Sequence, residues 1–345
     1  MDYEDPDGDH PLLSSFTKRA VLLFEDTCTR AFHFHNKVGQ SAAGLLLLLG
    51  IKKNKNKGKE EEGDVRLSSW QLAQGDTLAI LIALRPPRNL LHAFTLAIGQ
   101  RLWKESLVRV SVDGSVVPTY SILGNQNFWR TLVPTTPLDI PGPRSLVVNI
   151  KDGRPKPFVG TVDLCNKDYG IESIWLSDVK STISGTPKEM KAVEAMLASE
   201  TSQQYWHGPF IQPTAGEITT GYGLQRYYNG VYAKGYYHCG VDYGAEEGTN
   251  VQAPANGRVI LVGQEKDGFK LHGNCVGIDH GQGITSILMH LRSTLVEEGR
   301  YVKAGEVVGT VGATGLATGP HLHWGLHVHG KAVDPHQWMS DQLWL

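Results

Sequence analysis

The sequence predicts a mainly β protein with two β-rich domains and a connector between them. Over 64–154, short runs of β-branched and aromatic residues alternate with turn signals that contain Gly, Asp or Asn. Over 208–338, the chain is dense in glycine, and short apolar runs show alternating polarity. The clearest helical pattern, KEMKAVEAMLASE, lies between these regions at 188–200. Short strands separated by such turns are typical of sandwiches and barrels, so both regions are expected to be β domains.

The first β domain is expected at 64–154. Its expected strands are LAIL (78–81), LVRVSV (107–112), FWRTLV (128–133) and SLVVNI (145–150). Strands of this length and spacing predict an immunoglobulin-like antiparallel sandwich of about 90 residues. The segment 87–106 lacks the alternation, and a helical excursion is an open alternative there. The domain holds no cluster of residues that suggests catalysis.

The segment 155–207 is interpreted as a connector with one strand and one helix. IESIWL at 171–176 has a strand pattern, and Pro187 begins an amphipathic helix over 188–200. The apolar residues at positions 190, 193, 196 and 197 are expected to form its packing face. The second β domain follows at 208–338, and 339–345 form a tail.

The first 63 residues carry neither pattern. A helical stretch is expected around 16–34, and the charged run KKNKNKGKEEEG at 52–63 is typical of a solvated linker. The leucine run AAGLLLLLGI at 42–51 is about half of the ~20 residues that a membrane-spanning helix needs. Lysines follow it and no A-x-A cleavage site does, so no clean signal peptide is predicted. The segment is interpreted as an irregular leader, with a degraded export signal as the alternative.

Composition excludes several classes of protein. A net charge of −2 and a pI near 6.7 do not favour a nucleic-acid binder or a polybasic membrane anchor. The four cysteines, Cys28, Cys165, Cys239 and Cys275, form no C-x-x-C pair. Neither a zinc ribbon nor a disulfide scaffold is therefore predicted, although a Cys239–Cys275 bridge is left open.

Two histidine motifs lie in the second β domain. His238 and Asp242 are four residues apart, which is about 13 Å along a strand, but Gly240 between them permits a bend that brings both side chains together. His321 and His323 are two apart, so in a strand they point to the same face with Cα atoms about 6.6 Å apart. Each motif alone is weak evidence, whereas both in one β domain predict a metal site.

A further histidine, His290, ends the apolar run TSILMHL. Catalytic zinc takes three protein ligands in a tetrahedral array and leaves the fourth position for water. Two histidines and one aspartate supply such a set, and the remaining two histidines then serve as proton-handling groups. No G-x-S-x-G elbow is present, so a serine nucleophile is not expected.

The motifs of this domain resemble those of the M23 family of metallopeptidases, the lysostaphin and LytM-like group. The resemblance covers about 130 residues and is carried by H-x-x-x-D (238–242), M-H-L (289–291) and H-L-H (321–323). Glycine-rich segments support it, such as ITTGYGLQR (218–226), PANGRVILVG (254–263) and VKAGEVVGTVGATG (302–315). Residues 1–63 resemble no family.

The resemblance implies an antiparallel-β LytM-like catalytic domain at 208–338. It implies that His238, Asp242 and His323 bind Zn²⁺, and that the catalytic histidines are His290 and His321. It further implies hydrolysis of peptidoglycan peptides, either glycine bridges or stem-peptide cross-links, in the cell envelope, periplasm or extracellular space. No nucleic-acid partner and no clear transmembrane segment are predicted, and a monomer is expected.

Two alternatives come from other classes of protein. Some relatives of this family have lost metal ligands and only activate other wall hydrolases, but all five site positions are intact here. A lipoyl- or biotinyl-type carrier has a similar V-x-x-G hairpin pattern, but the sequence lacks the lysine tip that carries the cofactor. One hypothesis is that the upstream domain or the connector, which carries polar groups such as Asn166 and Asp168, covers the zinc cleft and partly inhibits the full-length protein. The alternative is that the upstream domain is a spacer or a wall-binding module.

Two groups of other polar residues are expected to play no part. His327 and His329 share the strand face of His323 but lie too far along it to bind the same ion. The histidines at 272, 280 and 336 are expected at the surface or in turns. Cys239 is expected to point away from its neighbour His238.

Overall fold

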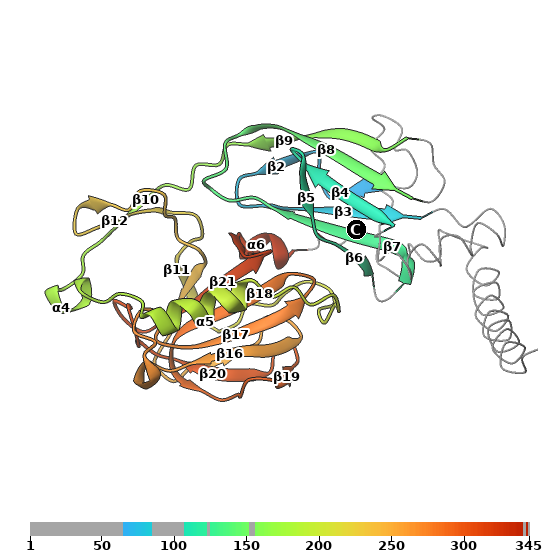
Figure 1. The fold of residues 1–345 in the computed structure, drawn as a ribbon. Helices are drawn as coiled ribbons and strands as arrows, with labels where there is room; N and C mark the ends of the chain where they lie inside the picture. The colour runs from blue at the N-terminus through green and yellow to red at the C-terminus, as the bar shows by residue number, and fades with distance from the viewer. Residues whose placement is uncertain (1–64, 85–106, 123–124, 152–155, 341–342, 344–345) are drawn as a thin grey trace, which may run out of the picture. The chain divides into compact units, whose positions relative to one another are not determined.

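The computed structural model describes residues 65–84, 107–122, 125–151, 156–340 and 343 (Figure 1). These residues belong to one compact unit, Gly58–Leu345. The leader with its helical stretch, leucine run and charged linker, and the ambiguous segment 87–106, lie outside the described residues. In the part of the chain that is described, no helix has the length and apolar character needed to cross a membrane.

The upstream domain consists of two sheets around one core. One sheet has the order β1-β3-β7-β6, with β1 (Val65–Leu67), β3 (Thr77–Ala83), β6 (Thr119–Ile122) and β7 (Asn125–Pro134). The other has the order β2-β9-β8-β4-β5, with β2 (Gln71–Ala73), β4 (Val108–Val112), β5 (Ser115–Val117), β8 (Gly142–Ile150) and β9 (Phe158–Cys165). Alternate residues of both sheets, such as Ile80, Ile82, Val110 and Val148, fill the space between them.

The mainly β fold class is therefore confirmed, and each of the four expected strands lies in or overlaps one of these. The expected immunoglobulin-like sandwich is antiparallel, and most strand pairs of these two sheets are antiparallel. Strand β2, however, pairs in parallel with β9. The immunoglobulin-like topology is therefore not confirmed and stays a prediction. Strand β9 comes from the segment that the sequence assigns to the connector.

The connector contains β10 (Ile171–Ile174), α4 (Asp178–Ser181) and α5 (Pro187–Leu197). Helix α5 begins with Pro187 and a capping box, in which Thr186 and Glu189 exchange hydrogen bonds. Val193 and Met196 pack against β16, as the apolar pattern predicts. Met190, expected on the same face, is 47% exposed, because the buried stripe of this helix passes through position 189 instead.

The C-terminal domain is built on a ten-stranded sheet with the main order β11-β14-β21-β18-β17-β16-β19. Its strands are β11 (Glu217–Thr220), β14 (Val241–Gly244), β15 (Asn250–Gln252), β16 (Gly257–Gly263), β17 (Asn274–Gly281), β18 (Ile284–Thr294), β19 (Tyr301–Val302), β20 (Val307–Val311), β21 (His321–Val328) and β22 (Lys331–Val333). A 3₁₀ turn (Glu265–Asp267) and helix α6 (Pro335–Trp338) complete it. Figure 1 shows α5 lying along β16 to β18.

The two faces of the central strands have different characters. In β21 the even-numbered residues Leu322, Trp324, Leu326 and Val328 are fully buried in the main core. The odd-numbered positions, which include His321 and His323, point to the other face because side chains alternate along a strand. This alternation separates the hydrophobic core from the polar site.

A small three-stranded sheet, β10-β12-β13, lies beside the site, with β12 (Gln225–Tyr228) and β13 (Val231–Tyr232). Strand β10 of the connector pairs in parallel with β12, and Glu172 lies directly opposite Arg226. The connector is therefore hydrogen-bonded to the C-terminal domain.

Candidate metal centre

Neighbouring strands bring Asp242 and His323 together. Asp242 in β14 is the cross-strand partner of His323 in β21, and Val241 and Tyr243 on either side of Asp242 are buried in the core. Side chains at directly opposed positions lie on the same face with Cβ atoms about 4.5–5.5 Å apart. The pairing of β14 with β21 thus sets the distance between the carboxylate and the imidazole.

His238 reaches the same point from the turn before β14. Its backbone N–H donates to Leu224 O at 2.8 Å, and its carbonyl accepts from Gly223 N at 2.9 Å. Gly240 makes the approach of the two segments possible. A Cβ at this position would lie 2.4 Å from Trp324 O and 2.7 Å from His323 Nε2, so only glycine fits without displacement.

Gly240→Ala is therefore expected to destabilise the fold by about 1–3 kcal/mol, as overpacking does, and to move His323 away from Asp242. Gly221→Ala is the matched control, since a Cβ at Gly221 meets no atom within 4 Å. Thermal unfolding and zinc titration of both variants test this. Equal stability and equal zinc affinity of the two variants would contradict the steric account.

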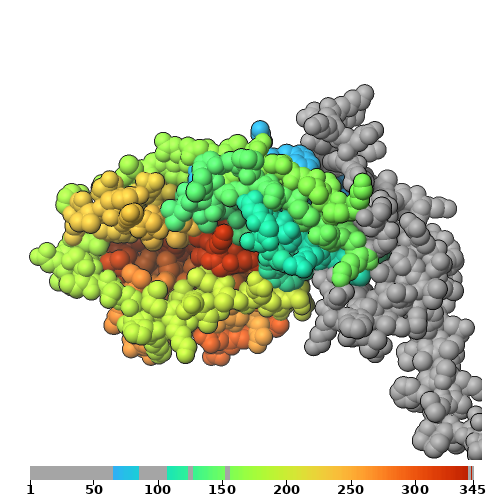
Figure 2. Space-filling model, turned by 45° about the horizontal axis from the view of Figure 1, so that its top comes forward, coloured from blue at the N-terminus to red at the C-terminus, as the bar shows by residue number. Residues whose placement is uncertain are grey.

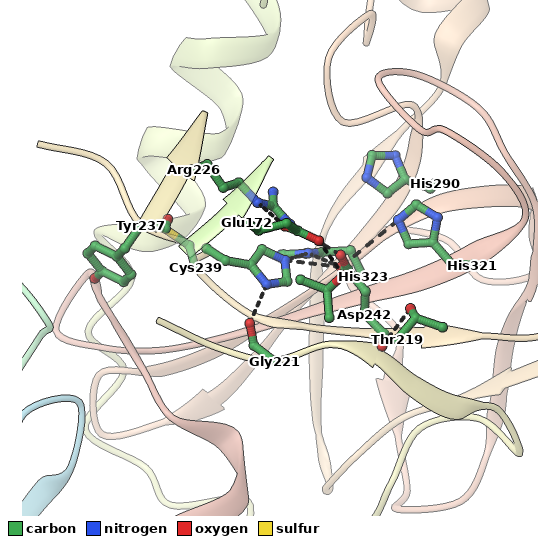
Figure 3. A network of polar contacts seen from close by, with 12 residues as sticks. Glu172, Thr219, Gly221, Arg226, Tyr237, Cys239, Asp242, His290, His321 and His323 are labelled. Carbon is green, nitrogen blue, oxygen red and sulfur yellow. Dashed lines mark hydrogen bonds and ion pairs between the residues drawn. The ribbon is translucent and has the colours of Figure 1, made fainter. Parts of the chain in front are cut away.

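The three side chains form a tight buried triangle, and Figure 3 labels two of its members, Asp242 and His323. His238 Nε2 lies 3.1 Å from Asp242 Oδ1 and 3.0 Å from His323 Nδ1, and His323 Nδ1 lies 2.7 Å from the same carboxylate oxygen. Among the described residues, this is the one group of three His, Cys, Asp or Glu side chains with such proximity. All three residues are less than 9% exposed.

Electrostatics favour a cation at this triangle. Burial alone would raise the pKa of Asp242, but hydrogen bonds from His238 and His323 outweigh it and hold that pKa well below its ordinary value. Burial lowers the pKa of His323 to about 4, although Asp242 opposes the shift. His238 Nδ1 lies 2.7 Å from Gly221 O, and this contact orients the ring so that Nε2 faces Asp242 and His323.

The donor set fits zinc. Two nitrogens and one carboxylate oxygen are ligands that Zn²⁺ takes, and bond lengths of about 2.0–2.1 Å imply tetrahedral ligand separations of about 3.3 Å. The observed separations of 2.7–3.1 Å approach that value.

The second oxygen of Asp242 is held by a residue outside the motif. Arg226 Nη2 lies 3.5 Å from Asp242 Oδ2, and Arg226 Nε donates to Glu172 Oε2 at 2.8 Å. Thr220 Oγ1 donates to the other oxygen of Glu172 at 3.1 Å. The connector strand β10 thereby orients the carboxylate of the candidate metal site through two charged side chains. Such partners of ligands typically tune metal affinity.

His321 and His290 lie on one side of the triangle. His321 Nε2 is 4.0 Å from Asp242 Oδ1, and its Nδ1 lies 2.9 Å from Gly319 O. The ring centroid of His290 is 4.9 Å from that of His321 and 6.3 Å from that of His323. The structure thus brings together all five residues that the sequence singled out.

His290 has an unusual backbone. Its φ of +62° lies in the left-handed region that favours glycine, at a register shift between β17 and β18. Its Nδ1 lies 2.9 Å from Thr314 O, which leaves Nε2 for the site. Burial lowers the pKa of His290 to about 3, and His321 and His323 add to the shift. Strain of this kind costs about 1–3 kcal/mol and is common at functional sites.

Figure 2 shows a hollow in the surface of the molecule. The orange-to-red C-terminal strands lie recessed between the yellow segment that contains β12 and the yellow-green connector.

Comparison with known proteins agrees with this geometry. The model of peptidase family M23 matches residues 236–335, which include all five histidine and aspartate positions of the site. The chain carries an M23 peptidase domain.

Related M23 proteins cover mainly this domain. The DD-carboxypeptidase/endopeptidase Mpg of Neisseria meningitidis is 43% identical over 98 residues, 28% of this chain and 22% of that protein. The murein hydrolase activator EnvC of Escherichia coli is 38% identical over 101 residues, 29% of this chain and 23% of that protein. The chain thus matches about a fifth of the length of these curated relatives.

One solved structure extends the likeness upstream. The putative peptidase M23 from Pseudomonas aeruginosa is 27% identical, with a TM-score of 0.50. The alignment covers 67% of this chain and 87% of that one. Because the M23 domain makes up less than half of this chain, some of the connector or upstream domain is included in the likeness.

The other histidines that the structure describes lie outside the triangle. His280, expected at the surface or in a turn, is fully buried, with its ring nitrogens 2.9 Å from Asn256 O and from Ser286 Oγ. Burial lowers its pKa to about 4, so it is a neutral core residue. His327 is buried further along β21, and His272 contacts Glu189. Thus the expectation for His280 was wrong, because a polar residue satisfied by two partners can be buried.

The three described cysteines do not join the site. Cys239 Sγ contacts Tyr237 O, and burial raises the pKa of its thiol to about 11, so it stays protonated. Cys239 and Cys275 are both free, and the bridge left open by the sequence is not formed. In the connector, Asp168 accepts a hydrogen bond from Gly170 N at 2.9 Å. Inhibition by Asn166 or Asp168 stays a hypothesis.

Proposed function

We propose that this protein is a zinc metalloendopeptidase that hydrolyses peptide bonds in peptidoglycan cross-links or stem peptides. The observation that carries the proposal is the buried triangle of His238, Asp242 and His323 with two further imidazoles on one side. A purely structural cluster would not need His290 and His321 beside it with their Nδ1 atoms held by backbone carbonyls.

In the proposed mechanism, His238 Nε2, His323 Nδ1 and Asp242 Oδ1 would hold a zinc ion. When bound, zinc supplies Lewis acidity to a carbonyl oxygen and lowers the pKa of water toward ~7. His290 and His321 each use Nδ1 toward a backbone carbonyl, which fixes the ring and leaves Nε2 as the proton acceptor. One of them takes a proton from the attacking water at Nε2, and the imidazolium so formed donates a hydrogen bond to the developing oxyanion before it passes the proton to the leaving amine.

The proposed substrate class rests on the relatives. Mpg is named for carboxypeptidase and endopeptidase activity, and EnvC for activation of murein hydrolases. From the peptidase activity in the name of Mpg and the murein in the name of EnvC, we propose peptidoglycan peptides as the substrate of this chain and the cell envelope as its location. The hollow in Figure 2 suits an extended peptide. A monomer suffices for the site, since one chain supplies all five residues.

A non-catalytic activator is the second candidate, because EnvC is among the relatives. The complete set of three metal-binding and two proton-handling side chains argues against it, since an activator needs none of them. The lipoyl- or biotinyl-carrier alternative lacks any support in the site.

Digestion of defined cross-linked muropeptides tests the proposed function. We expect the protein to cleave a peptide bond in them, to lose activity when a chelator removes zinc, and to regain it with one equivalent of zinc. The same protein with His321→Ala is the control for a contaminating hydrolase. An inactive zinc-loaded protein that stimulates a separate wall hydrolase would support the activator instead.

A further inference from the structure

The strained His290 needs an element that holds it in place. Its backbone N–H donates to His272 O at 3.1 Å, and its ring Nδ1 lies 2.9 Å from Thr314 O. Both carbonyls belong to segments outside β18. The position of His290 therefore depends on the loop at 270–274 and on the loop around Thr314.

These two loops are packed closely against each other. Thr314 Oγ1 accepts from Asn274 N at 2.9 Å and donates to Leu291 O at 2.8 Å. A Cβ on Gly273 would lie 2.5 Å from that same hydroxyl oxygen, and Gly273 has a φ of +66°. A displacement of 270–274 would therefore move both groups that hold His290.

One carboxylate holds the loop at 270–274. Glu189 Oε1 accepts from the backbone N–H of Leu271 at 3.0 Å and of His272 at 2.7 Å, and lies 2.8 Å from His272 Nδ1. Glu189 Oε2 accepts from Lys270 N at 3.0 Å. Glu189 is fully buried, and these hydrogen bonds outweigh the effect of burial and lower its pKa.

The number of these bonds exceeds what the helix requires. The capping box of α5 needs only the contact of Glu189 Oε2 with Thr186 N, at 3.1 Å. A carboxylate that served the helix alone would be left at the surface with water as its other partner. Four donors at 270–272 instead surround it, and burying an ionised group without such donors would be costly.

From this chain of contacts, and given the proposed function, we propose that Glu189 is a positioning residue for His290. Its carboxylate fixes the 270–274 loop, and the loop fixes the backbone and the ring of His290. Glu189 lies in the connector helix, outside residues 236–335 that match the family model. The connector thus supplies part of the support of the site.

The test uses the full-length, zinc-loaded chain with Glu189→Ala, Glu189→Gln and, as matched control, Glu194→Ala on the exposed side of the same helix. On a soluble cross-linked muropeptide dimer, Glu189→Ala should lower kcat about 10- to 100-fold, as small misplacements of catalytic groups do, with KM and zinc content unchanged. Glu189→Gln, which keeps one acceptor oxygen, should lose less. Glu194→Ala should match the unaltered protein.

A double-mutant cycle separates positioning from general stability. If Glu189 acts through His290, Glu189→Ala should cause no further loss of kcat in a His290→Ala background. A loss of the same factor in both backgrounds would overturn the proposal. The cycle is repeated with Glu189→Gln, so that the proposal is still tested if the alanine variant misfolds.

A second readout does not depend on activity. In protein labelled with ¹⁵N-histidine, the imidazole signals of His290 should move in Glu189→Gln and stay in place in Glu194→Ala. Unmoved signals in Glu189→Gln would refute the positioning role. If the unaltered protein holds zinc but cleaves nothing, the proposed function fails, and these signals still decide whether Glu189 positions His290.

Discussion

Asp242→Ala and His323→Ala should each abolish stoichiometric zinc binding and reduce peptidase activity to background. Each variant leaves two of the three buried ligands. Removing a residue that only hydrogen-bonds to a ligand typically lowers metal affinity 10–100-fold, so we expect at least this loss when a ligand itself is removed. Asp242→Ala also removes the only negative charge at the triangle, so two neutral imidazoles would face a dication. Metal analysis and zinc titration of the purified variants measure the effect.

Thermal unfolding gives an independent measure of the same loss. A ligand that binds only the folded state stabilises it by about 2.7 kcal/mol at a hundred times its Kd. Added zinc should therefore raise the melting temperature of the unaltered protein and leave that of both variants unchanged. His327→Ala is the matched control, since it removes a buried imidazole from the same strand but outside the triangle. About one zinc per chain in both Asp242→Ala and His323→Ala would refute the ligand assignment.

The motif residues could be predicted because their spacing is local. His321 and His323 are two apart on a strand, and period-two alternation alone places them on one face. His238 and Asp242 required Gly240 between them, and the structure shows that a side chain there would collide with Trp324 and His323. His290 could be assigned only through family resemblance, since a lone histidine at the end of an apolar strand carries no local signal.

Residues that support the site could not be predicted, because their contacts join distant segments. Glu172 acts on Asp242 through Arg226, and it meets Arg226 because β10 pairs in parallel with β12. The sequence pattern of neither strand specifies which strand it pairs with. From the sequence alone, Glu189 is expected to be exposed, because glutamate is rarely buried. Its burial depends on four hydrogen-bond donors about 80 residues away in the sequence. His280 was misplaced for the same reason.

The upstream sheets show a similar division. Apolar alternation predicted the strands that became β3, β4, β7 and β8, because burial of one face imposes that pattern. The sequence pattern did not predict the parallel pair of β2 and β9, and β9 lies beyond residue 154, where the domain was expected to end. Strand existence is a local property, whereas strand partners depend on the packing of the whole sheet.

His290→Ala should keep one zinc per chain and lose about 10²–10⁴-fold in kcat, the range typical of a general acid or base. Its ring centroid lies 6.3 Å from that of His323, and its Nδ1 is committed to Thr314 O, so the side chain is placed to exchange protons rather than to bind the metal. Metal analysis together with kcat on a soluble muropeptide dimer measures both parts of the prediction.

The backbone of His290 supplies the control. At a φ of +62°, alanine keeps the strain while glycine relieves it, so His290→Gly should unfold at a higher temperature than His290→Ala. If the imidazole carries the chemistry, both variants should nevertheless lose kcat by a similar factor, because both lack the ring. Recovery of activity in His290→Gly would show that the role of position 290 lies in its backbone, and loss of zinc in both variants would show that His290 is a ligand.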